Sequence, residues 1–186
     1  MYLDEILEHN KQFVEAKHYE PHQTSKLPNQ KSVILTCMDT RLIELLPAAM
    51  NIKNGDVKMI KNAGGVITGP YDSVVRSLLI AINVLQAEEV LIIGHKDCGM
   101  QKLDPSFVME QMSQRQVENK DFQAVADAGI DIKEWLAGFE TVEQSVESSV
   151  DILKKHPLMP AHIPVHGLVI SPETGELSLV ARGYGE

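Results

Sequence analysis

The chain has 186 residues, of which 44% are apolar and 23% charged, so it is long enough to bury a substantial core without disulfides. Its formal net charge of −9 argues against a nucleic-acid-binding surface, which needs clustered lysine and arginine. The most apolar long stretch, 74–85, contains Arg76 and Asn83 and is too short to span a bilayer. We therefore expect a single domain over 1–186 that binds neither nucleic acid nor membranes.

The two cysteines, Cys37 and Cys98, are the only ones in the chain, and residues 1–5 lack the basic start of an export signal. Without such a signal we expect the cytoplasm, where thiols stay reduced. In that compartment a pair of cysteines more often binds a metal or takes part in catalysis than forms a disulfide.

The first predicted element is an amphipathic helix near the N-terminus. Its apolar residues recur at helical spacing: Leu3, Ile6, Leu7, Phe13 and Val14. The polar stretch 20–28 that follows is typical of a connection, so we expect 1–28 to form an N-terminal helical arm. The spacing does not decide whether this helix packs on its own domain or reaches a partner subunit.

Strands and helices then alternate along the chain. The composition predicts strands over 31–36, 56–60 and 89–94, with helices between them over 42–50 and 71–86. We expect Pro47 to sit in the first turn of its helix or to break it. This order predicts an α/β fold, with a mainly parallel central sheet and helices on both faces.

The C-terminal half adds a helix and a hairpin. Residues 101–138 are polar and helical only in patches, whereas 141–155 predict a helix with Thr141 as its N-cap. The strand-like segments 165–170 and 176–181 flank a turn and therefore predict a closing C-terminal β-hairpin.

Two short motifs follow two of the predicted strands, Cys37-Met38-Asp39-Thr40-Arg41 and His95-Lys96-Asp97-Cys98-Gly99. The carboxyl ends of parallel strands meet at one edge of a sheet, where ligands bind, so we expect Cys37, His95 and Cys98 to face one another. Two sulfurs and one imidazole suit zinc, and three protein ligands leave a fourth position open, as in catalytic sites. The spacing of His95 and Cys98 fits either a turn or the first turn of a helix, which would favour the Cys98 thiolate.

Asp39 lies two residues after Cys37 and has two possible partners. It could be a fourth zinc ligand in a closed form, or Arg41 could hold it away from zinc through a bidentate pair. In the second arrangement it would orient a reacting water; a purely structural ion pair is the alternative. Because two thiolates neutralise zinc, bound water should be only moderately acidified, so we expect activity to rise into the alkaline range.

The paired motifs Cys-x-Asp-x-Arg and His-x-x-Cys, each after an apolar strand, resemble those of the β-class carbonic anhydrases, in particular their compact bacterial branch. The stretch Lys61-Asn62-Ala63-Gly64-Gly65 is similar to the Arg-Asn-Ala-Gly stretch of that family, with lysine in place of arginine. Gly64 and Gly65 could equally serve a turn that requires positive φ.

The resemblance implies one zinc ion per subunit on Cys37, His95 and Cys98, with Asp39 and Arg41 as the catalytic dyad. It implies the reversible hydration of carbon dioxide to bicarbonate and a proton by a zinc-bound hydroxide. It also implies a substrate pocket near Gly64 and Gly65, and a homodimer or a dimer of dimers.

Other functions fit parts of the pattern. The same site could hydrolyse carbonyl sulfide or carbon disulfide, or the protein could hold zinc with little catalysis and act in regulation or interaction. Cys37 and Arg41 are too close for the phosphate loop of a cysteine phosphatase, and the Cys-x-x-Cys of a thiol oxidoreductase is absent.

Overall fold

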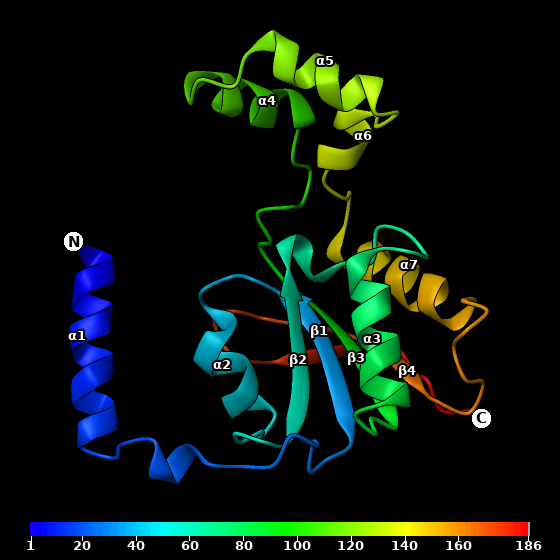
Figure 1. The fold of residues 1–186 in the computed structure, drawn as a ribbon. Coiled ribbons are helices and arrows are strands. Elements are labelled where there is room, and N and C mark those ends of the chain that lie inside the picture. Colours follow the sequence, from blue (N-terminus) through cyan, green and yellow to red (C-terminus); the bar gives the residue numbers. More distant parts are fainter. Residues whose placement is uncertain (186) are drawn as a thin grey trace.

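The computed structural model describes residues 1–185, and its centre is a five-stranded sheet of order β2-β1-β3-β4-β5 (Figure 1). The strands are β1 (Ser32–Cys37), β2 (Val57–Asn62), β3 (Glu89–His95), β4 (Val165–Ile170) and β5 (Leu177–Ala181). The first four run parallel, and β5 pairs antiparallel with β4. The mainly parallel sheet and the closing hairpin are therefore confirmed.

Within residues 1–185, seven α-helices accompany the sheet: α1 (Tyr2–Glu15), α2 (Leu42–Ala49), α3 (Ser73–Asn83), α4 (Pro105–Gln114), α5 (Asn119–Asp127), α6 (Ile132–Leu136) and α7 (Val142–Lys154). Two short 3-10 helices are η1 (Glu20–His22) and η2 (Ala63–Gly65). The crossovers through α2 and α3 step in opposite directions along the sheet, so right-handed connections place these helices on opposite faces. The connection through α7, from β3 to β4, moves along the sheet in the same direction as the connection through α3. The helices α3 and α7 therefore cover the same face of the sheet.

The core lies around β1 and β3. Every residue of β1 is buried, because this strand has a neighbour on each side and helices over both faces. The helix α7 approaches the sheet closely over two glycines. A Cβ atom at Gly94 or Gly167 would lie 2.7 Å from a methyl group of Val142 or Val146, so only glycine allows this packing distance.

Local signals account for most helix ends. The Asp72 side chain accepts a hydrogen bond from the Val75 N–H (2.8 Å) at the start of α3, and Thr141 caps α7 as predicted. The prediction for Pro47 is wrong, because it lies inside α2 near its C-terminal end. Only one helical hydrogen bond is lost there, and the Pro47 carbonyl still accepts from the Ile52 N–H (2.8 Å).

Two parts extend away from the sheet. The N-terminal helix α1 has no buried residue and stands apart from the strands in Figure 1. Beyond the carboxyl ends of the parallel strands, α6 contacts both α4 and α5, and none of the residues of these three helices is buried. Among residues 1–185, no helix combines the length and the apolar character needed to cross a membrane.

Candidate metal centre

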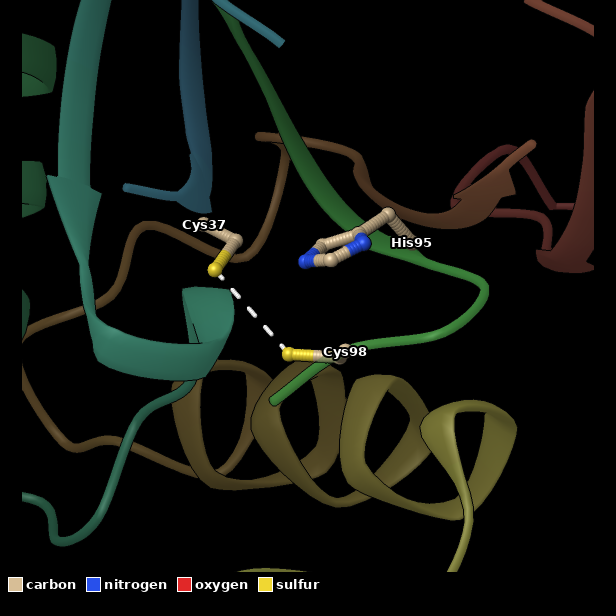
Figure 2. A group of neighbouring side chains, drawn as sticks. All are labelled: Cys37, His95 and Cys98. Carbon is tan, nitrogen blue, oxygen red and sulfur yellow. Dashed lines mark hydrogen bonds between the residues drawn. The ribbon is translucent and has the colours of Figure 1, made fainter. Parts of the chain in front are cut away.

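The ends of two neighbouring strands and one turn bring Cys37, His95 and Cys98 together. Cys37 ends β1, His95 ends β3, and Cys98 lies in the turn that follows β3. All three are buried, and their ligand atoms lie within 4.8 Å of one another. Figure 2 shows the two sulfurs and the ring edge directed toward one space. The residues predicted as metal ligands from the sequence thus converge in the structure.

The geometry of this cluster fits a tetrahedral zinc ion. Two sulfurs that each lie about 2.3 Å from zinc are about 3.8 Å apart, and the Sγ atoms of Cys37 and Cys98 are 4.0 Å apart. The Nδ1 atom of His95 lies 2.9 Å from the Lys96 carbonyl oxygen, which favours the proton on Nδ1. The opposite ring nitrogen, Nε2, is buried without a hydrogen-bond partner among the described residues, and a metal would satisfy it.

The two thiols hold their protons with different strength. The pKa of Cys37 is lowered, mainly because its sulfur accepts a hydrogen bond from the Cys98 thiol, with help from His95 and the backbone N–H groups of Asp39 and Gly64. The same contact, together with burial, raises the pKa of Cys98. No helix begins at Cys98, since the next one starts at Pro105, so the turn is the correct alternative and helix-terminus stabilisation of this thiolate is absent.

His95 also holds its proton more tightly than a free imidazole. Burial lowers the pKa of His95, but its interactions with Cys37 and with the Lys96 carbonyl outweigh this effect, so the pKa is raised overall. Cys98 and His95 therefore hold protons that a metal ion must displace before it can bind.

Asp39 forms the bidentate pair with Arg41 that the sequence left as one of two alternatives. Its Oδ1 accepts from the Arg41 Nε–H at 3.0 Å and its Oδ2 from an Nη2–H at 2.8 Å. Oδ2 lies 3.8 Å from Nε2 of His95, so the carboxylate borders the cluster without belonging to it. The Arg41 guanidinium lowers the pKa of Asp39 to about 2, which keeps this carboxylate ionised at neutral pH.

Asp97 is the residue whose contacts sequence reasoning missed. Its side chain is 85% exposed, yet its Oδ2 accepts a hydrogen bond from Nη1 of Arg41 at 2.9 Å. This contact depends on the left-handed backbone of Asp97 (φ 56°), which nothing in the motif spacing indicates.

Gly64 and Gly65 form the tight turn η2 beside the cluster. Their φ angles are 87° and 65°, so the expected turn with positive φ is present. A Cβ atom at Gly65 would lie 2.7 Å from the Cys37 nitrogen. A cavity of about 650 Å³ lies next to this turn, and Asn62, Ala63 and Phe139 are among its lining residues. Neither glycine lines it.

The family model for carbonic anhydrase matches residues 32–177, which include the cluster and strands β1 to β4. The chain belongs to the β-carbonic anhydrase family. It is 55% identical over 182 residues to the Bacillus subtilis protein named "Putative carbonic anhydrase YvdA", a match that covers 98% of this chain and 92% of that protein.

Structures of β-carbonic anhydrases are similar over the full length. The crystal structure of β-carbonic anhydrase isoform I from Trichomonas vaginalis superposes with a TM-score of 0.88 at 33% identity, over 99% of this chain and 100% of that chain. A carbon disulfide hydrolase from Acidithiobacillus thiooxidans is a more distant relative, 29% identical over 161 residues, which cover 81% of this chain and 78% of that protein. The fold is thus that of a family with more than one named activity, and the cysteine–histidine cluster could hold a metal ion.

Proposed function

We propose that this protein binds one zinc ion through Cys37, His95 and Cys98 and catalyses the reversible hydration of carbon dioxide to bicarbonate and a proton. The supporting observation is the buried cluster of two sulfurs and an unpartnered imidazole nitrogen, beside which Arg41 restrains the carboxylate of Asp39. Zinc held by two thiolates and one imidazole would act as a Lewis acid that makes water a nucleophile.

The residues around the cluster would then have distinct tasks. Asp39, ionised and next to the cluster, would accept a hydrogen bond from the reacting water and so orient its lone pair toward carbon dioxide. Arg41 would hold Asp39 in that position. The backbone N–H groups of Asp39 and Gly64, which help to lower the pKa of Cys37, would moderate the charge of this ligand.

The two alternative functions have weaker support. The relatives named as carbon disulfide hydrolases are 25–29% identical to this chain, well below the 55% of the relative from B. subtilis. A protein that held zinc only for structure or interaction would not need an ionised carboxylate fixed beside an open side of the cluster. Carbon dioxide hydration would use both the ionised carboxylate of Asp39 and the open side of the cluster.

A stopped-flow assay of carbon dioxide hydration tests the proposal. We expect zinc-loaded wild type to be active, with a rate that rises into the alkaline range, and Asp39→Asn to lower the rate about 10- to 100-fold while zinc stays bound. Asp151→Asn is a matched control, because Asp151 is an exposed carboxylate that pairs with Lys155 far from the cluster. An inactive zinc-loaded wild type, or an Asp39→Asn variant with full activity, would contradict the proposal.

We also infer that the protein forms a homodimer or a dimer of dimers. The helix α1 exposes a stripe of large apolar side chains, with Leu3 62%, Ile6 45% and Leu7 59% exposed. None of the residues of α1 is buried within the chain. A second copy of the chain is the simplest partner that would cover this stripe.

A further inference from the structure

The guanidinium of Arg41 connects the two loops that carry the proposed metal ligands. On one side its Nε–H and one Nη2–H bind the carboxylate of Asp39, which follows β1. On the other side it contacts Asp97, which follows β3. Nη1 lies 2.9 Å from Oδ2 of Asp97 and Nη2 lies 3.0 Å from its carbonyl oxygen. Four of the five N–H donors of Arg41 are therefore used by two aspartates.

The turn after His95 is shaped so that Asp97 offers two acceptors to the same guanidinium. Its φ of 56° is a left-handed conformation that asparagine, aspartate and glycine adopt more readily than other residues. Both the carbonyl oxygen and the carboxylate of Asp97 meet Arg41 from this turn. Arg41 itself is 41% exposed, so without these contacts its outer end would face solvent and could rotate.

The position of Arg41 matters because the carboxylate of Asp39 could also occupy the open side of the metal cluster. Oδ2 of Asp39 is 3.8 Å from Nε2 of His95, so a small rotation of this carboxylate would bring it to the side of the cluster that the three ligands leave open. The bidentate bond to Arg41 opposes that rotation, and it does so only while the guanidinium keeps its orientation.

We propose that Asp97 is a positioning residue that fixes Arg41 and, through it, keeps Asp39 out of the fourth coordination position. This inference rests on the proposed zinc site and explains what keeps that site open to a small ligand. The side chain of Asp97 is 85% exposed, and exposed ion pairs have modest strength. Asp97 therefore shifts the balance between two positions of Asp39, and its loss should leave zinc bound.

The test compares Asp97→Gly with Asp97→Asn in zinc-loaded protein, with thiocyanate as the probe of the open position. Both variants remove the charge and both tolerate the left-handed backbone, but only asparagine keeps a side-chain oxygen that can accept from Arg41. We expect Asp97→Gly to bind thiocyanate about two- to fivefold more weakly than Asp97→Asn. Cobalt-substituted protein allows the binding to be followed by its visible spectrum. Equal affinity in the two variants would overturn the proposal.

A second comparison asks whether the effect passes through Asp39. In an Asp39→Asn background the side chain at position 39 is a much weaker metal ligand, so the difference between Asp97→Gly and Asp97→Asn should disappear. A difference of the same size in that background would show that Asp97 acts by another route and would overturn the proposal. Carbon dioxide hydration is measured separately on the same preparations. Absence of that activity with the thiocyanate difference intact would contradict the proposed reaction and leave the role of Asp97 standing.

Discussion

A zinc ion bound as proposed would displace protons from the cluster, and the structure predicts which ones. Zinc requires both sulfurs as thiolates and the imidazole neutral. The pKa of Cys37 is lowered, whereas those of Cys98 and His95 are raised, so the displaced protons come from Cys98 and His95. As the pH rises through the raised pKa of His95, this ring loses its proton before zinc arrives. Release should therefore fall from about two protons per zinc toward about one, and the affinity for zinc should rise with pH.

Calorimetry of zinc binding in buffers of different ionisation enthalpy measures this release as the pH is raised. Cys98→Ser serves as the reference, because it removes one sulfur ligand and should bind zinc far more weakly. If three protons were released per zinc at neutral pH, Cys37 would have to be protonated there as well, which contradicts its lowered pKa.

At the residue scale, the candidate metal ligands could be predicted from the sequence, but the contacts that orient them could not. Cys37, His95 and Cys98 could be predicted because each follows an apolar strand, and strand ends of a parallel sheet meet. The Lys96 carbonyl that holds His95 and the Asp97 carboxylate that holds Arg41 depend on the conformation of one tight turn. The conformation of such a turn leaves no recognisable spacing of residue types in the sequence, so it became visible only in the structure.

At the scale of elements, α1 provides a test of assembly. We expect wild type to have at least twice the mass of the 20.6 kDa chain in solution. Replacing Ile6 and Leu7 together by glutamine should dissociate it, because each buried side chain of this size contributes about 1.5–3 kcal/mol. Size-exclusion chromatography with light scattering reports the mass directly.

Glu8→Gln is the matched control for this experiment. It places the same new residue on the face of α1 away from the apolar stripe, so the mass should stay that of wild type. A monomeric wild type at micromolar concentration, or a double variant with unchanged mass, would rule out the role proposed for α1.

The elements that could be predicted are those in which hydrophobic periodicity and burial agree. The strands β1 and β3 are continuous apolar runs because they lie inside the sheet with both faces covered. Residues 101–138 gave only patches, and the structure explains why, since the three helices α4 to α6 bury no residue and need no long apolar face. Pro47 was misplaced because proline is tolerated where a helix is about to end.

At the scale of the whole molecule, the fold serves mainly to align two strand ends and one turn. β1 and β3 are adjacent and supply Cys37 and His95, and η2 closes against the end of β1 through a glycine contact too tight for any side chain. The order of the strands is what places residues 37 and 98, far apart in the chain, with their sulfurs 4.0 Å from each other. The metal centre is therefore a property of the topology as much as of the motifs.

The most direct test of the metal centre is X-ray absorption at the zinc edge on zinc-loaded wild type. The account predicts one zinc per chain with two sulfurs at about 2.3 Å and two lighter atoms at about 2.0–2.1 Å, of which one is the nitrogen of His95. Zinc bound without sulfur, or a chain with both cysteines reduced that retains no zinc, would contradict it.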